Sequence, residues 1–166
     1  AGGSIPGEGG GVFFKAKNIH FSQSGGLWWR ASTSTIKGNS PEIHFSASEE
    51  LVLSDLETIL LYTHYRAPGD TTRLNLHLSG DTVRINNVSM TNWGRYSFPE
   101  NHDEKYSDNP ELVDSYSNME IFGKSRVEIS NGSKLIVETG KLSIASEEID
   151  ISNSSLKLMT YLLGDS

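Results

Sequence analysis

Residues 118–159 read NMEIFGKSRVEISNGSKLIVETGKLSIASEEIDISNSSLKLM and decide the fold of this chain. Short apolar pairs recur along this stretch, and the two members of each pair are two positions apart. The pairs are Val127/Ile129, Leu135/Val137, Leu142/Ile144, Ile149/Ile151 and Leu156/Leu158. A spacing of two places both side chains on one face of a β-strand. The stretch therefore predicts a series of very short strands separated by polar turns.

A coiled coil is the alternative, because the pairs from Leu135 onward recur every seven residues. A heptad seam needs apolar residues at spacings of three and four. In the four pairs from Leu135 onward, the residues three positions after the first member are Glu138, Ala145, Ser152 and Met159. Only two of these are apolar. The intervening segments are rich in Gly, Ser and Asn, which disfavour helix interiors. The pattern favours strands.

The composition limits the class of protein. The chain has 166 residues, a formal net charge of −7 and no cysteine. This length suits one domain with a buried core. The negative charge argues against a nucleic-acid partner, and the lack of cysteine removes disulfides, thiolate catalysis and zinc sites built on Cys. No run of about 18 apolar residues is present, so we expect no membrane insertion.

The expected organisation is a glycine-rich flexible leader at residues 1–11, followed by a single β domain at residues 12–166. The chain begins with Ala and shows no signal peptide, so we expect a processed form or a fragment of a larger protein. Residues 99–118 hold two prolines and six acidic residues and predict a loop excursion from the β domain.

Longer sequence repeats, which we call echoes, suggest how the strands are arranged. NIHFSQS at 18–24 is matched by EIHFSAS at 42–48, and NLHLSGD at 75–81 is a looser copy. VEISNGS at 127–133 is matched by IDISNSS at 149–155. Offsets of 24 and 22 residues predict one coil of three short strands per repeat. Stacked coils would place Ile129 over Ile151 and Asn131 over Asn153.

The predicted fold class is therefore all-β, as a parallel β-helix (β-solenoid) with irregular excursions. An antiparallel β-sandwich is the alternative, because Asn131-Gly132 is the preferred two-residue hairpin turn. Two central segments are ambiguous. Residues 50–62 fit two buried strands or a helix opened by Ser46 and Glu49, and we predict strands. Residues 74–85 fit two strands that could form a hairpin.

The IHFSxS and xISNxS echoes resemble the degenerate repeats of right-handed β-helix surface proteins. These include bacterial autotransporter passengers, filamentous-haemagglutinin-like exoproteins and phage tailspikes. The resemblance covers about residues 12–60 and 118–160. It implies a secreted or cell-surface location and an extended scaffold, and it transfers no functional residue.

Aromatic residues provide the candidate ligand-binding site. The predicted ligand-binding residues are Trp28, Trp29, Trp93, Arg95 and Tyr96. Exposed Trp and Tyr beside polar groups are platforms for sugar rings and anchors at protein interfaces. The alternative is that these aromatics close the ends of the core.

Metal and catalytic sites are not predicted. His20 and His44 occupy the same phase of the echo, so we expect them to stack on one outer face, but a third zinc ligand is missing. The acidic loop lacks the calcium-loop spacing, although it offers Asp103, Glu104, Asp108, Asn109 and Glu111.

Catalytic motifs are also missing from the sequence. There is no G-x-S-x-G motif, which would mark a serine nucleophile. Asp55/Glu57 and Glu147/Asp150 are carboxylate pairs that nothing singles out. We expect no cofactor.

These observations predict a non-enzymatic extracellular module of a bacterial surface adhesin or of a secreted or virion fibre. Its expected partner is a host surface glycan or protein, and a homo-oligomer or continuation of a larger chain is possible. A carbohydrate-active enzyme, or the carbohydrate-binding domain of one, is the alternative. A purely structural spacer is the third.

Overall fold

The computed structural model describes residues 11–22, 27–32, 42–64, 74–95, 117–138 and 140–159. Within these ranges the protein is all-β, with nine strands in one sheet and no helix. The strands are β1 (Gly11–Ser22), β2 (Leu27–Ser32), β3 (Glu42–His64), β4 (Leu74–Arg95), β5 (Ser117–Ser130), β6 (Lys134–Glu138), β7 (Gly140–Ala145), β8 (Glu148–Ile151) and β9 (Ser155–Met159).

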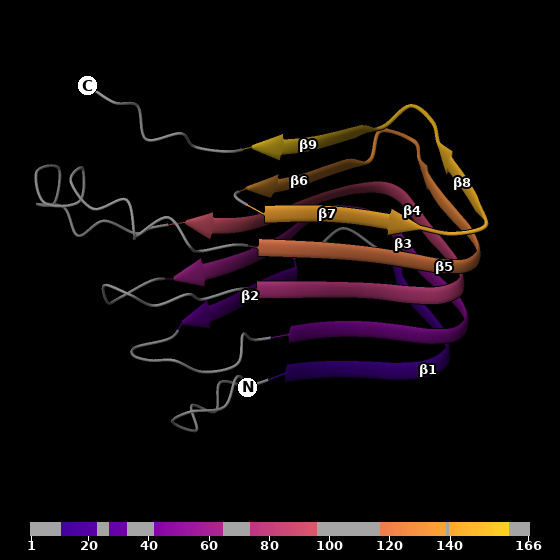
Figure 1. Cartoon of the computed structure of the whole chain (residues 1–166), viewed down its shortest axis with the longest axis horizontal. Coiled ribbons are helices and arrows are strands. Elements are labelled where there is room, and N and C mark those ends of the chain that lie inside the picture. The colour runs from indigo at the N-terminus through magenta and orange to yellow at the C-terminus, as the bar shows by residue number, and fades with distance from the viewer. Residues whose placement is uncertain are drawn as a thin grey trace, which may run out of the picture.

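Every pairing between these strands is parallel. The chain makes five successive passes, and each pass pairs with the one before it: β1 with β2, then β3, then β4, then β5 with β6, then β7 to β9 (Figure 1). Parallel pairing rules out the antiparallel sandwich for the described part of the chain. Asn131-Gly132 joins β5 to β6, two strands that do not pair with each other, so it is not a hairpin turn.

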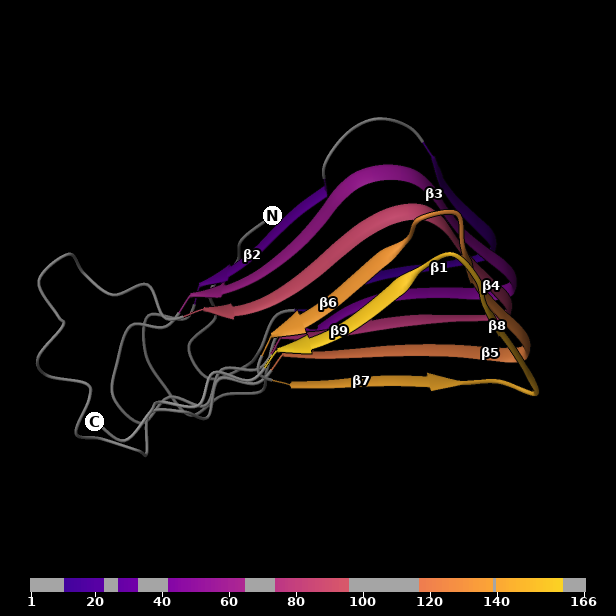
Figure 2. The same ribbon diagram turned by 90° about the horizontal axis from the view of Figure 1, so that it is seen from above.

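Each pass has three flanks, and bends in the long strands separate one flank from the next (Figure 2). The first flank holds the N-terminal parts of β1, β3, β4 and β5 together with β7. The second holds the C-terminal parts of β1 and β5, the middle of β3 and β4, and β8. The third holds β2, the ends of β3 and β4, β6 and β9.

One aliphatic core fills the space between the three flanks. In β4, for example, Leu76 and Leu78 come from the first flank, Val83 and Ile85 from the second, and Met90 from the third. All of these side chains are at most 1% exposed. Alternation of inward apolar and outward polar residues along each flank explains why these segments form strands.

In β4 and β5 the first bend requires a glycine, because the backbone is crowded there. A Cβ atom on Gly80 would lie 2.8 Å from the carbonyl oxygen of Thr82. A Cβ atom on Gly123 would collide with the backbone of Arg126. Real Cβ atoms do not approach so closely, so the glycines permit the bend in β4 and β5.

The second bend is made by residues with left-handed backbone dihedrals. Asp55, Asn87, Asn131 and Asn153 have φ values of 53°, 53°, 54° and 45°. Asn and Asp adopt this conformation more readily than other residues with a Cβ atom. The same backbone solution recurs in four successive passes.

Several sequence predictions are confirmed. Ile129 pairs with Ile151, and the last pass consists of three short strands. Residues 50–62 are strand and not helix, with the bend at Asp55. Asn131 and Asn153 occupy the same bend of successive passes, where the Gly132 N–H donates to the Asn153 carbonyl. The Asn131 side chain donates to Asn86 Oδ1 of the preceding pass at 3.0 Å.

Two predictions are wrong. The 24-residue offset does not hold in the first half: Phe14 pairs with Phe45, 31 residues later, and His20 pairs with Val52 instead of His44. The proposed hairpin at 74–85 belongs to a single bent strand, β4, which pairs in parallel on both sides. The predicted leader (1–11) and loop (99–118) extend slightly too far, since Gly11 begins β1 and Ser117 begins β5. The rest of both segments lies outside the described residues.

Candidate functional site

The predicted aromatic site falls on the third flank. Trp28 and Trp29 lie in β2 and pair with Leu60 and Leu61 of β3, while Trp93 of β4 pairs with Tyr62. The backbone register thus brings the two tryptophan segments to strands on either side of β3. Arg95 closes the described part of β4. The side chains of these residues and the whole of Tyr96 lie outside what the structure describes.

A half-open depression of about 330 Å³ lies at the second bend, on the border of the same third flank. Its polar lining includes Asp55, Asn87, Ser89 and Lys134. Leu56 and Val88, both buried, close its floor. The depression therefore combines a carboxylate, an amide, a hydroxyl and an ammonium group over an apolar base. Its volume is at the lower end of ligand pockets, which start at about 300 Å³.

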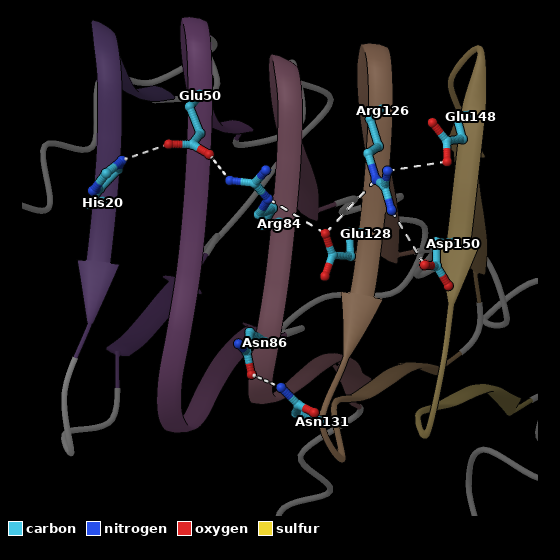
Figure 3. Close-up of polar contacts among 9 residues, drawn as sticks. All are labelled: His20, Glu50, Arg84, Asn86, Arg126, Glu128, Asn131, Glu148 and Asp150. Atoms are coloured by element: carbon cyan, nitrogen blue, oxygen red, sulfur yellow. Dashed lines mark hydrogen bonds and ion pairs between the residues drawn. The ribbon is translucent and has the colours of Figure 1, made fainter.

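The second flank carries a row of charged side chains that crosses the strands (Figure 3). His20 Nε2 lies 3.3 Å from Glu50, and Glu50 also pairs with Arg84 of the next pass. Arg84 Nε lies 3.5 Å from Glu128. The row thus links β1 to β5 through alternating charges.

Arg126 completes this row toward the last pass. Its guanidinium lies 3.2 Å from Glu148 and 3.4 Å from Asp150, and 3.9 Å from Glu128 on its own strand (Figure 3). These side chains are partly exposed, and surface ion pairs are worth about 0–1 kcal/mol each. The row sets the charge pattern of this flank more than it stabilises the sheet.

A compact cluster lies on the first flank. His44 of β3 pairs with His77 of β4, and their rings stack with centroids 4.2 Å apart and planes 10° apart. His44 Nε2 lies 2.9 Å from Glu42, and His77 Nδ1 lies 3.0 Å from Glu120. Phe13 stacks on the other face of His44 at 4.7 Å.

This cluster corrects the sequence prediction that His20 and His44 stack. His20 lies on the second flank beside Glu50, whereas His44 stacks on His77. The signal was present in the looser echo NLHLSGD at 75–81, which aligns with EIHFSAS at 42–48 in the register of β3 and β4. The motif around His44 is thus correct, but the partner predicted for His44 is wrong.

Two of the carboxylates weighed for catalysis, those of Asp150 and Asp55, have structural partners. Asp150 pairs with Arg126, and Asp55 accepts a hydrogen bond from Asn87 at 2.9 Å. The backbone N–H of Glu147 donates to the Lys124 carbonyl. The side chain of Glu57 and the acidic loop residues 103–111 lie outside the described part.

Comparison of the chain with protein-family models, with curated proteins and with solved structures gave no match. In the portion of the chain that the structure covers, no helix is long and apolar enough to span a membrane.

Proposed function

We propose that this chain is a parallel β-helix segment of a secreted or cell-surface protein, in which it acts as a non-enzymatic structural and binding module. The observation that carries the proposal is the in-register stacking of five passes around one aliphatic core, with polar ladders outside. Such a scaffold is rigid, repetitive and extendable, and it presents flat outer flanks for recognition.

The scaffold itself is tested by a designed disulfide, because the chain has no cysteine of its own. Ser46 and Ser79 are register partners with hydroxyls 3.2 Å apart. Neighbouring strands lie about 4.8 Å apart, which is within the usual Cα separation of about 4.4–6.8 Å for a disulfide. The double variant Ser46→Cys/Ser79→Cys should oxidise readily.

The matched control is Ser46→Cys/Thr82→Cys, since Thr82 pairs with Glu50 and not with Ser46. Mass spectrometry under mild oxidation should find an intramolecular disulfide in the first variant and free thiols in the second. Equal cross-linking of both pairs, or of neither, would contradict the proposed stacking.

For the binding activity, we propose a glycan ligand held on the third flank. The depression at the second bend offers acceptors on Asp55 and donors on Lys134, and sugar hydroxyls need both. The strand segments that carry Trp28, Trp29 and Trp93 run along the same flank. Aromatic rings there would supply the apolar surface that sugar recognition usually uses.

A glycan array with the wild type and three variants tests this ligand. Asp55→Asn removes the carboxylate but keeps a residue that tolerates the left-handed backbone. Trp28→Ala removes an aromatic residue from a register row whose members Thr91 and Ile136 are half-buried and not part of the core. Lys17→Met is the control, because Lys17 lies on β1, where it pairs with Glu49. Binding that both site variants weaken at least tenfold and the control retains would support the proposal. A wild type that binds no glycan would refute it.

The enzymatic alternative makes a different prediction in the same experiment. Glycoside hydrolysis needs a protonated and an ionised carboxyl group on either side of the bond. Of the carboxylates considered for catalysis, Asp150 is paired with Arg126 and Asp55 accepts a hydrogen bond from Asn87, which supports a binding role over hydrolysis. Release of reducing sugar from any glycan bound on the array would favour the enzyme.

A further inference from the structure

The cluster on the first flank has the composition of a metal site. Glu42 and His44 lie two residues apart on β3, so both side chains lie on the same side of the strand. His77 is the register partner of His44 on β4, and Glu120 is the partner of His77 on β5. Parallel in-register stacking thus assembles two imidazoles and two carboxylates from three consecutive passes.

The possible donor atoms lie close together. One donor atom each from Glu42, His44 and His77 lie within 4.8 Å of one another. A tetrahedral zinc ion with bonds of about 2.0–2.2 Å holds its donor atoms about 3.3 Å apart. His44 Nε2 and a carboxylate oxygen of Glu42 are already 2.9 Å apart. Because the two rings stack with planes 10° apart, both must turn about their side-chain bonds before their nitrogen lone pairs point at a shared ion. The three side chains are 24–44% exposed, which leaves room for that turn.

Glu120 orients the second imidazole. His77 Nδ1 lies 3.0 Å from a Glu120 carboxylate oxygen, which is the contact expected of an Nδ1–H donor. That tautomer leaves the lone pair on Nε2. A carboxylate behind the ring in this way is the usual support for a metal-binding histidine, because it fixes the ring and raises its basicity.

The charges also favour a cation. Among the described residues, Glu42 and Glu120 form ion pairs only with the two histidines, whereas Glu50, Glu128, Glu148 and Asp150 are neutralised by arginines. With neutral imidazoles the cluster carries two uncompensated negative charges. A divalent ion would compensate them.

We propose that Glu42, His44 and His77 bind a zinc ion, with Glu120 as the positioning residue and water in the fourth position. The two imidazoles and one carboxylate are the donor set that zinc takes with an open coordination position. The ion would tie together β3 and β4, and through Glu120 β5. This site is separate from the glycan site proposed above, which lies on another flank.

Isothermal titration of the chain, prepared without a polyhistidine tag, with zinc chloride tests the proposal. The wild type should show one saturable site. Loss of one ligand in His44→Ala or His77→Ala should weaken binding at least 100-fold, and Glu120→Gln should weaken it about tenfold, as outer-shell changes do. Glu42→Gln should also weaken binding at least tenfold.

The matched control is His20→Ala, which removes an exposed histidine that also contacts a glutamate, Glu50. It should leave zinc affinity unchanged. Circular dichroism of each variant establishes that it is folded, and Glu42→Gln, which keeps the side-chain shape, serves if a histidine variant unfolds. Cobalt in place of zinc should give the visible absorption of a tetrahedral site in the wild type.

Absence of a saturable site in the wild type would overturn the proposal. So would zinc binding that His44→Ala, His77→Ala and Glu42→Gln all retain when folded, because the ion would then be held by other residues.

Discussion

Asn87 donates a hydrogen bond from Nδ2 to the Asp55 carboxylate over 2.9 Å, and both residues have a φ of 53°. The bond therefore joins the same bend in two successive passes. Each of the two side chains therefore has two functions: it tolerates the left-handed backbone conformation, and it links one pass to the next.

Replacement of Asn87 separates these two functions. Asn87→Gly keeps the backbone freedom and loses only the hydrogen bond, which should cost about 0.5–1.5 kcal/mol of unfolding free energy. Asn87→Val loses the bond and also forces a β-branched residue into the left-handed region, which costs a further ~1–3 kcal/mol. Urea unfolding measures both. Equal losses in the two variants would show that the backbone conformation at this bend carries no strain.

The local pattern of this chain predicted its strands correctly because side-chain alternation is a property of a few neighbouring residues. Leu135 and Val137 are fully buried, as their spacing of two indicated. In the last two passes the connections are short, so the repeat in sequence equals the repeat in space. Ile129 and Ile151 accordingly pair as predicted.

The register of the first passes could not be predicted in this way, since all three flanks share the same alternation. Ile19 and Phe21 belong to the second flank, whereas Ile43 and Phe45 belong to the first. The two motifs look alike in sequence, yet they lie on different sides of the core. The connections between passes also differ in length, so that Met119 follows its partner Leu76 by 43 residues and precedes Leu142 by 23.

The candidate metal site escaped prediction for the same reason. A ligand pair formed by stacking depends on the register between passes, and a shift of a few residues replaces His77 by another partner. Once β3 and β4 are aligned, His44, His77 and Glu120 fall in one row. Sequence spacing therefore indicates which residues face outward but not which of them meet.

The charged row on the second flank should contribute little to stability. Arg84 bridges Glu50 and Glu128, but its side chain is 47% exposed. Arg84→Met keeps the apolar stem and should lower the unfolding free energy by about 0–1 kcal/mol. The loss should shrink in about 1 M salt, where the screening length is about 3 Å. A loss well above 2 kcal/mol that persists in high salt would mean that the row is a major stabilising element. Lys17→Met, which breaks a more exposed pair with Glu49, is the control.

Burial along the stack should determine the cost of removing a core side chain. Leu135 and Leu156 are register partners on β6 and β9, yet Leu135 is fully buried and Leu156 is 40% exposed. Leu135→Ala should therefore cost about 2–5 kcal/mol, because it leaves a cavity between packed passes. Leu156→Ala removes the same atoms from a site that already contacts water, so it should cost about 1 kcal/mol or less. Chemical unfolding of the two variants under identical conditions measures the difference. Equal destabilisation would show that another part of the chain, or a partner, covers Leu156 in solution.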